Sequence, residues 1–289
     1  MSHKIYKYNT THSSIDYSIV VPIYNQDDII VNNLNSYIIN TINPFEIILI
    51  LDFCSDKSEE NIVSFLDNYN NINSDLVQII IYKNEEPLFE TKCDNIGFKA
   101  SIGKYCLEIQ ADMEMIEHGY NLHLTKPFNI LNNVIAVSGR CCHKLCSGKG
   151  VGKLGRLIET PIEKLGVDKN MFYVYDTCNR GPLLIDRSKL IELNYLNEDI
   201  YYLAGSDHDL MIRAYLEKNY ICGYVPISFN APLSHGSRRN NKRTTNDQCL
   251  NTKKNSLQRQ KLEKIYAENN KMPYYKSIWK DKPAEKYKI

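Results

Sequence analysis

Short apolar segments alternate with amphipathic ones along the first part of this chain, and this alternation limits the folds that are open to it. Each of Tyr17–Ile23, Glu46–Leu51 and Val77–Tyr82 is apolar, rich in β-branched residues and followed by polar residues, as in a buried strand. Residues 29–38 and 57–69 separate these segments and carry apolar side chains at helical spacing. Strands that are apolar on both faces and linked by helices form a mostly parallel sheet with helices on both sides. The sequence therefore predicts an α/β fold.

The same kinds of pattern continue toward the C-terminus with less regular spacing. They predict helices at 96–101 and 205–218, and strands at 105–111, 134–138, 171–176, 182–186 and 221–225. A sheet of this type binds its ligands at the carboxyl ends of its strands. Polar residues that directly follow a strand are therefore the first candidates for a functional site.

Composition divides the chain into three parts. Residues 1–15 are polar, and we expect them to be a flexible N-terminus. Residues 16–237 hold all the predicted strands and form the main domain. Residues 238–289 are basic and polar, and we expect a largely helical extension there, with a helix over 256–269. Residues 141–153 are rich in Gly, Lys and Cys, which is typical of a loop.

Charge and cysteine content exclude some classes of protein. The formal net charge of +1 gives no overall field that would attract nucleic acid. The nine cysteines and the missing N-terminal apolar stretch indicate free thiols in a reducing compartment, so we expect a cytoplasmic protein. The longest apolar runs are far shorter than the roughly 20 residues that cross a bilayer, so we expect no membrane span.

Asp112 and Glu114 follow the predicted strand at 105–111. Residues two apart in an extended segment point to the same side. Two carboxylates on one side of the chain, at the carboxyl end of a strand, suit Mg²⁺ or Mn²⁺, which prefer oxygen ligands. The alternative is a solvated turn in which the two acids have no shared role.

Three other polar residues have both a functional and a structural interpretation. Asp52 could accept hydrogen bonds from a ribose or a base, or it could cap the next helix. Asp207 could be a general base, or Ser206 and Asp209 could form a capping box at the start of the helix predicted at 205–218. His235 follows the last predicted strand and could bind a metal or be a structural or exposed residue.

Two further patterns resemble known motifs only superficially. Gly150–Gly155 has the glycine spacing of a dinucleotide-binding loop, but no convincing strand precedes it. Cys141–Cys146 contains residue types that bind zinc, but the second, well-spaced ligand pair of a zinc module is missing. The sequence assigns no function to the thiols of this segment.

Several segments match a known family in order and spacing. They are Ser18–Asn25, Leu51–Asp56, Asn95–Gly97 with Ala100, Gly103 and Tyr105, Asp112–Glu114, Asn179–Ile185, and Gly205–Leu210 with Arg213. Taken together, these segments resemble the family 2 glycosyltransferases of the GT-A fold, from about residue 15 to residue 235. The resemblance implies a GT-A sheet, Rossmann-like and mostly parallel, for residues 16–237.

The resemblance also implies a site and a reaction. It places a nucleotide-sugar, expected to be UDP-linked, against Pro22, Tyr24, Asp52, Asn95, Ala111 and Asp112. It implies a Mn²⁺ or Mg²⁺ ion on Asp112, Glu114 and His235, and Asp207 as the general base of an inverting transfer. It puts Arg180, Gly181 and Ser206 near the donor or acceptor sugar. The acceptor could be a glycan, a lipid-linked sugar or a protein, and an oligomer is possible.

The chain departs from the family pattern at four positions. Phe53 and Ser206 replace acids, Glu114 replaces an aspartate, and Asp94 stands where relatives often carry Arg. The first two leave open a catalytically degenerate domain that binds a sugar or a partner. A nucleotidyltransferase would need a glycine-rich, basic turn after the first strand, but residues 24–28 are acidic and contain no glycine.

Overall fold

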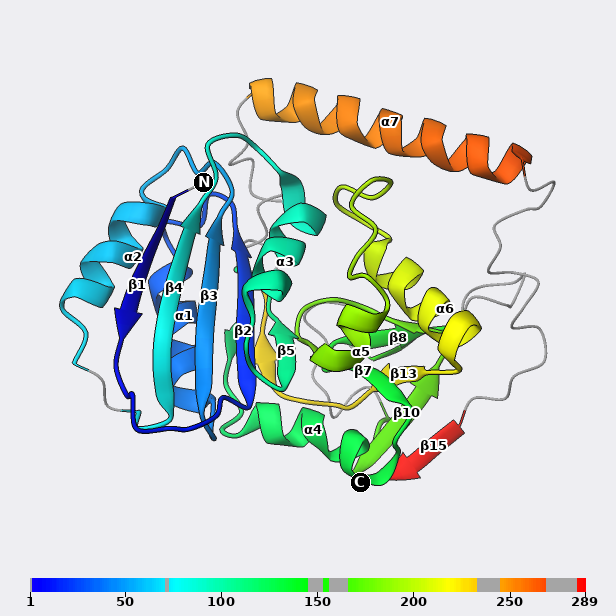
Figure 1. The fold of residues 1–289 in the computed structure, drawn as a ribbon, viewed down its shortest axis with the longest axis horizontal. Helices are drawn as coiled ribbons and strands as arrows, with labels where there is room; N and C mark the ends of the chain where they lie inside the picture. The colour runs from blue at the N-terminus through cyan, green and yellow to red at the C-terminus, as the bar shows by residue number, and fades with distance from the viewer. Residues whose placement is uncertain (1, 71–72, 145–152, 156–165, 233–244, 269–284) are drawn as a thin grey trace.

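The computed structural model describes residues 2–70, 73–144, 153–155, 166–232, 245–268 and 285–289 (Figure 1). Its centre is a ten-stranded sheet with the order β1-β4-β3-β2-β5-β12-β7-β13-β10-β15. The strands are β1 (Ser2–Lys7), β2 (Tyr17–Ile23), β3 (Phe45–Leu51), β4 (Leu76–Lys83), β5 (Tyr105–Glu108), β7 (Val134–Ser138), β10 (Met171–Tyr175), β12 (Leu183–Asp186), β13 (Ile221–Tyr224) and β15 (Glu285–Lys288).

Most of these strands run in one direction. β4, β3, β2 and β5 are parallel neighbours, and β7 pairs in parallel with β13. The antiparallel pairs leave only β1, β10 and β12 pointing against the other seven strands of this sheet. The predicted α/β fold with a mostly parallel sheet is therefore confirmed.

Helices cover both faces of the sheet, as the apolar strands require. Ile19 and Val21 of β2 belong to a core cluster with α1 (Ile30–Asn40), α2 (Ser58–Asp67) and α4 (Tyr120–Ile130). Val20, which points the other way, belongs to a second cluster with α3 (Phe89–Ala100), α5 (Arg187–Glu192) and α6 (Ser206–Lys218). Figure 1 shows α3 in front of the sheet and α1 behind it.

The expectation of a flexible N-terminus over residues 1–15 is wrong for its first half. Residues 2–7 form β1, which pairs antiparallel with β4 from Ser2↔Lys83 to Lys7↔Gln78. The strand was missed because its side chains are mostly exposed and polar, as is usual for an edge strand. Its Lys4 forms an ion pair with Asp67 of α2, Nζ to Oδ1 at 3.2 Å.

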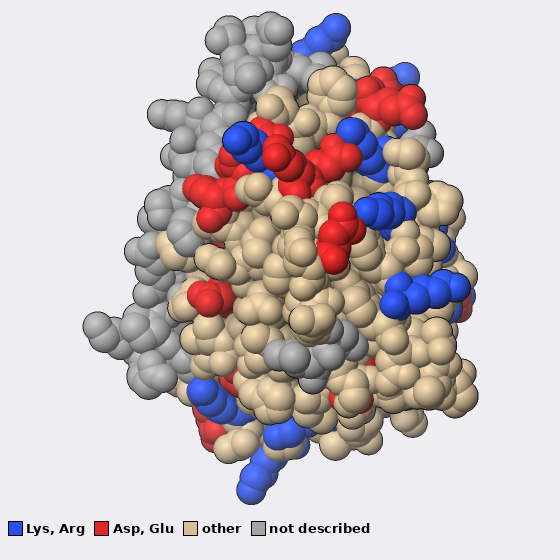
Figure 2. All heavy atoms as spheres, turned by 90° about the vertical axis from the view of Figure 1, so that its left-hand side faces the viewer, with Lys and Arg blue, Asp and Glu red and all other residues tan. Residues whose placement is uncertain are grey.

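Figure 2 looks onto the side of the molecule where β1 and α2 lie in Figure 1. Lys and Arg side chains stand among Asp and Glu side chains there, with a broad uncharged area between them. Mixed charge along an edge strand discourages pairing with the edge of another molecule.

The C-terminal extension is helical only in part. The helix α7 (Thr245–Glu268) begins earlier than predicted. The last described residues form β15, which pairs with β10 and belongs to the main sheet rather than to a separate extension. The segment expected to be a loop contains β8 (Cys141–His143) and β9 (Lys153–Gly155), which form a small sheet with β11 (Thr177–Cys178). Within the described part of the chain, every helix is too short or too polar to cross a membrane.

Candidate active site

The carboxyl ends of the central strands bring several predicted residues together. The register of β2 and β3 sets Ile23 beside Leu51, so Tyr24 and Asp52 leave the sheet side by side. Pro22 and Tyr24 are half-buried whereas Ile23 between them is buried, so both face the same side. On the other side of β2, Ala111 follows β5, and its carbonyl accepts a hydrogen bond from Asn33 Nδ2 of α1 at 2.8 Å.

The segment after β5 is a turn and not the extended chain that was predicted, because Met113 N donates a hydrogen bond to Gln110 O at 3.0 Å. Met113 and Met115 are buried, with 2% and 1% of their surface exposed, whereas Asp112 and Glu114 are half-buried. Asp112 lies in this turn, and Glu114 begins the short strand that follows it. Glu114 belongs to β6 (Glu114–Met115), which pairs with β14 (Phe229–Asn230), and its Oε2 accepts a hydrogen bond from Asn230 Nδ2 at 2.8 Å.

This carboxylate pair fits a hard divalent cation. Mg²⁺ and similar ions are often held by one or two carboxylates and keep water and phosphate oxygens as their other ligands. The third predicted ligand, His235, lies outside the described residues. Among the residues that are described, no three His, Cys, Asp or Glu side chains gather closely enough to hold a metal without further ligands.

Asp52 is tied into the protein. Its Oδ1 accepts hydrogen bonds from Asn84 Nδ2 at 3.0 Å and from Leu88 N at 2.8 Å, and its Oδ2 accepts one from Phe89 N at 2.9 Å. It therefore fixes the turn before α3 and does not cap α2, the next helix in sequence. Asp52 is only 7% exposed, so these hydrogen bonds use most of its capacity as an acceptor.

The structure argues against the predicted nucleotide contact of Asn95. Its side chain is 1% exposed. Its Oδ1 accepts a hydrogen bond from Leu196 N at 3.0 Å, and its Nδ2 donates to Leu196 O at 2.9 Å and to Glu198 Oε2. Every donor of the amide group is used in holding the loop before α6, so Asn95 has a structural role.

Asp207 lies in the first turn of α6, whose N-cap is Gly205 with φ +92°. Its Oδ1 accepts from His208 N at 2.9 Å and its Oδ2 from Arg180 N at 3.2 Å. Burial alone would raise the pKa of this carboxyl, but His208, Arg180 and the two backbone donors lower it. Asp207 is therefore ionised at neutral pH, as a general base must be.

The capping-box alternative for this helix start is wrong. Ser206 is fully buried, and its Oγ lies 3.1 Å from Thr91 Oγ1. Asp209 accepts a hydrogen bond from Arg213 Nε one turn later, at 2.8 Å. Neither side chain therefore closes the box, and the buried Ser206 hydroxyl is turned toward α3 rather than toward a sugar.

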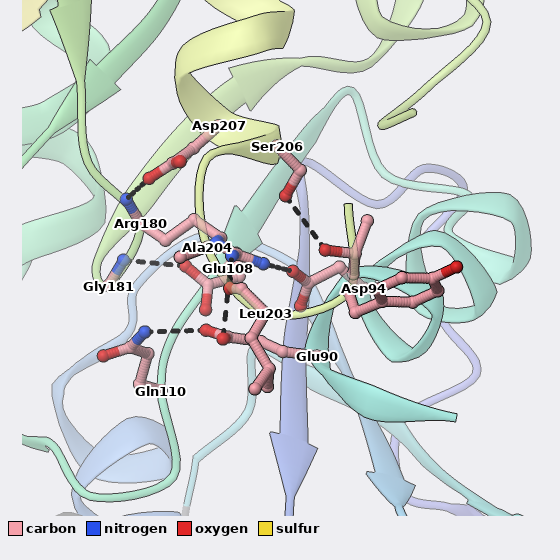
Figure 3. A network of polar contacts seen from close by, with 12 residues as sticks. Glu90, Asp94, Glu108, Gln110, Arg180, Gly181, Leu203, Ala204, Ser206 and Asp207 are labelled. Atoms are coloured by element: carbon pink, nitrogen blue, oxygen red, sulfur yellow. Dashed lines mark hydrogen bonds and ion pairs between the residues drawn. The ribbon is translucent and has the colours of Figure 1, made fainter. Parts of the chain in front are cut away.

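Arg180 is the centre of a buried network of charged groups (Figure 3). Its guanidinium lies 2.5 Å from Asp94 Oδ2, donates to Leu203 O at 2.5 Å, and is 3.6 Å from Glu90 Oε2. The next residue, Gly181, donates its N–H to Glu108 Oε2 at 2.7 Å. The Arg180 side chain is 5% exposed, so its guanidinium positions protein groups. It is not turned toward a sugar, in contrast to the prediction from the sequence.

Four carboxyl groups surround this one guanidinium, and they do not all ionise alike. Burial raises the pKa of Asp94 to about 7, although Arg180 opposes this rise. Burial and the neighbouring Asp94 raise the pKa of Glu108 well above its usual value. Both side chains also have one oxygen without a hydrogen-bond partner among the described residues, which a neutral acid tolerates better than a carboxylate. Asp94 therefore holds a proton below about pH 7, and Glu108 has a raised pKa, whereas the pKa of Asp207 is lowered.

Gly181 joins this network to the carboxylate pair. A Cβ at this position would lie 2.8 Å from Gln110 Cγ and 2.9 Å from Met113 Cε, and its φ is +66°. Asp207 is bonded to Arg180, and Gly181 packs against the residues on either side of Asp112. The predicted base is thus linked through Arg180 and Gly181 to the segment that carries the predicted metal ligands.

Glu90, Glu108, Gln110 and Arg140 also border this site and were not predicted. Gln110 Nε2 donates to Glu90 Oε1 at 2.9 Å, and Arg140 Nη1 donates to Gln110 Oε1 at 3.2 Å. A signal for two of them was present in the sequence, because positions 108, 110, 112 and 114 are all polar. That period of two marks one side of an extended chain.

Comparison with known proteins gives one matching family for the chain that carries this site. The sequence profile of the family described as Glycosyl transferase family 2 matches residues 18–172, more than half of the 289 residues. No curated protein matches the chain.

Solved structures share the fold at low sequence identity. S. aureus TarS 1–349 in complex with UDP is 16% identical over 75% of this chain and 60% of its own, with a TM-score of 0.51. The same protein in complex with UDP-GlcNAc is 16% identical over 80% of this chain and 62% of its own, with a TM-score of 0.52. GalNAc-T7 with UDP, GalNAc and Mn²⁺ is 14% identical over 76% of this chain and 44% of its own, with a TM-score of 0.53. The chain thus spans less than two thirds of each of these structures, and the likeness establishes the GT-A fold.

Proposed function

Because the chain belongs to glycosyl transferase family 2, we propose that it transfers a sugar from a nucleotide donor to a hydroxyl group of an acceptor. The observation that supports this most directly is the ionised, buried Asp207, linked through Arg180 and Gly181 to the segment that carries Asp112 and Glu114. A base beside a site for a diphosphate is the arrangement that direct displacement at a sugar carbon requires.

The proposed donor is a UDP-linked hexose or N-acetylhexosamine. UDP is present in the TarS and GalNAc-T7 structures, whose fold this chain shares. We assign Pro22, Tyr24, Asp52, Ala111 and Asp112 to the nucleotide, because they lie at the carboxyl ends of β2, β3 and β5. Phe53 stands beside Asp52 with φ +54° and half of its surface exposed, so its ring is available to stack on the base.

We assign a Mn²⁺ or Mg²⁺ ion to Asp112 and Glu114, with His235 as a further candidate ligand. When bound, such an ion neutralises the negative charge that grows on the departing diphosphate. The protein supplies two half-buried carboxylates, one in the turn after β5 and one in β6, and Asn230 fixes the direction of the second.

Asp207 acts as the general base in this proposal. Its carboxylate takes the proton of the acceptor hydroxyl while that oxygen forms a bond to the anomeric carbon. The bond from this carbon to the diphosphate breaks in the same step, so the configuration at the carbon is inverted. Gly181 lines the sugar site through its backbone, whereas Arg180 and Ser206 position the site from within the protein.

The acceptor class remains a choice among a glycan, a lipid-linked sugar and a protein side chain. One alternative function has a specific observation in its favour. Phe53 and Ser206 replace acids of the family, and Ser206 is turned into the core, so a domain that binds a sugar without turnover is the second candidate.

The test is the release of nucleotide from a panel of nucleotide sugars, measured with Mn²⁺ and with EDTA. We expect one UDP-sugar to be hydrolysed slowly with Mn²⁺, and the release to stop in EDTA. Asp112→Ala should lower it at least about 100-fold, because it removes a metal ligand. Glu60→Ala, which removes an exposed carboxylate of α2, is the control.

Two results would count against the proposal. If nucleotide binds in the presence of Mn²⁺ but no donor is ever turned over, the sugar-binding domain becomes the better explanation. If neither binding nor turnover depends on a metal, the assignment of Asp112 and Glu114 is wrong.

A further inference from the structure

The helix α7 contacts the loop that leads into α6. Figure 1 shows it lying along the side of the molecule on which α3 and this loop are found. The loop runs from Asp199 to Ala204 and ends just before Asp207. We call it the base loop.

One side chain of α7 binds the base loop through its main chain. Gln258 Oε1 accepts a hydrogen bond from Tyr202 N, and Gln258 Nε2 donates one to Ala204 O, both at 3.1 Å. Both ends of one amide group thus fix two backbone groups that are two residues apart, as a neighbouring strand would. Such paired bonds set the position of a loop as well as its distance.

Two lysines of α7 hold the side chain of Tyr202. Lys254 Nζ is 4.9 Å and Lys261 Nζ is 5.4 Å from the centre of its ring. Lys261 also donates to Tyr202 Oη at 3.0 Å and to Asp199 O. Tyr202 is 6% exposed, and its carbonyl accepts a hydrogen bond from Thr91 N of α3 at 3.0 Å. Tyr202 is therefore fixed by α7 on one side and by α3 on the other.

The contacts of α7 lead to both halves of the candidate site. Leu203 O in the base loop accepts the hydrogen bond of the Arg180 guanidinium, and Arg180 N binds Asp207. On the nucleotide side, Lys254 Nζ lies 5.9 Å from the ring of Phe89, whose N–H binds Asp52. The helix α7 thus reaches Asp52 through Phe89, and it reaches Asp207 through the base loop and Arg180.

We propose that α7 holds the base loop in the position that the reaction needs, and that Gln258 is its main positioning residue. The inference rests on the proposed function for its effect on the reaction, but the contact itself is independent of that function. The residues of α7 that make these contacts lie about 50 positions after the base loop, so the loop has these partners only when α7 is docked.

The test compares Gln258→Ala with Gln260→Ala. Gln260 lies in the same helix two residues later and is exposed, so the control has the same change of side chain without the contact. Hydrogen–deuterium exchange of the base loop should become about tenfold faster in Gln258→Ala, because the Tyr202 amide loses its acceptor. Exchange in Gln260→Ala should match that of the unchanged protein.

Kinetics gives the second readout. We expect kcat for sugar transfer or donor hydrolysis to fall about 10- to 100-fold in Gln258→Ala, with the donor KM changed less than about twofold, because only the base side is displaced. Equal exchange in the two variants would overturn the inference, and so would faster exchange with unchanged kcat. A third outcome would instead contradict the proposed function. In it, the wild-type protein shows no turnover, although Gln258→Ala still loosens the base loop.

Discussion

At the scale of single residues, the site separates acids that are ionised from acids that are not. Asp207 is stabilised as a carboxylate by His208, by the charge of Arg180 and by two backbone N–H groups, whereas Asp94 and Glu108 are fully buried. One cation cannot offset the burial of all these acids, so the pKa values of Asp94 and Glu108 are raised. This division makes the role of each acid testable.

The base assignment predicts the behaviour of Asp207→Asn. Arg180 N and His208 N bind different oxygens of Asp207, so an amide accepts only one of these two hydrogen bonds, and it cannot take a proton at neutral pH. We expect kcat to fall about 100- to 10,000-fold, with the donor KM little changed and the melting temperature lower by a few degrees. A variant that keeps more than a tenth of the original kcat would show that another group is the base.

The raised pKa of Asp94 predicts that the protein loses stability as the pH rises. The folded state binds a proton at Asp94 up to about pH 7, whereas the unfolded chain releases it near 3.8, so the folded state holds more protons between these values. The free energy of unfolding should therefore decrease from about pH 4 to about pH 7. The pKa of Asp207 is lowered, so its titration changes the free energy of unfolding only at pH values below this window.

Chemical unfolding at several pH values checks this prediction. Asp94→Asn should show a smaller slope than the unchanged protein, because the amide does not titrate. Glu108, which has the same direction of shift, should account for part of the slope that remains. Equal slopes in the two proteins would mean that Asp94 is ionised in the fold.

At the scale of elements, the junction between β11 and β12 joins the base to the carboxylate pair. Gly181 lies at this junction, where its φ of +66° and the close approach of Gln110 and Met113 leave no room for a side chain. A change here should therefore disturb packing at the centre of the site rather than at its rim.

Gly181→Ala should destabilise the protein more than Gly166→Ala. Both positions have nearly the same φ, +66° and +65°, but a Cβ at Gly166 would meet no atom of the described residues within 4 Å. The strain of the left-handed conformation, about 1–3 kcal/mol, should thus be common to both variants. The excess loss in Gly181→Ala, measured by urea unfolding, reports the clash. Equal losses would mean that Gln110 and Met113 move aside freely.

The elements that were predicted well are those whose own residues determine them. β2 and β7 have the predicted bounds, because each is a short apolar run between polar residues. α4 was missed because Pro127 lies inside it and its apolar stripe is weak. β1 was missed because an exposed edge strand needs no apolar pattern.

The site was predictable only where it depends on local order. The alternation from 108 to 114 is visible in the sequence, and so is the position of Asp207 at a helix start. The hydrogen bond between Arg180 and Asp94 joins residues 86 positions apart, and the one between Asn95 and Leu196 joins residues about 100 apart. No local pattern contains those pairings, so Asn95 was assigned to the nucleotide when its partners are the backbone groups of Leu196.

At the scale of the whole molecule, both edges of the large sheet are formed by segments near the ends of the described chain. β1 covers one edge of β4, and β15 covers one edge of β10, and both carry exposed lysines. Charged, short edge strands protect a sheet from pairing with other molecules.

Deleting residues 2–7 should therefore promote self-association. The deletion exposes the backbone groups of β4 over six residues, next to the apolar side chains of Ile79, Ile80 and Ile81. Light scattering after size exclusion should show a mass that rises with concentration, to a greater extent than for the full chain. The same mass at all concentrations for both proteins would show that β4 is protected in another way.

The docking of α7 also has a consequence for the order in which the protein is made. Gln258 is synthesised about 50 residues after Asp207, so at about 5–20 residues per second the ribosome needs roughly 3–10 seconds to cover that distance. During this interval the sheet and the acids of the site can already be folded while the base loop still lacks its partner. A nascent chain would thus fold its sheet and the acids of the site before the base loop reaches its final position, which it gains only after α7 has been made.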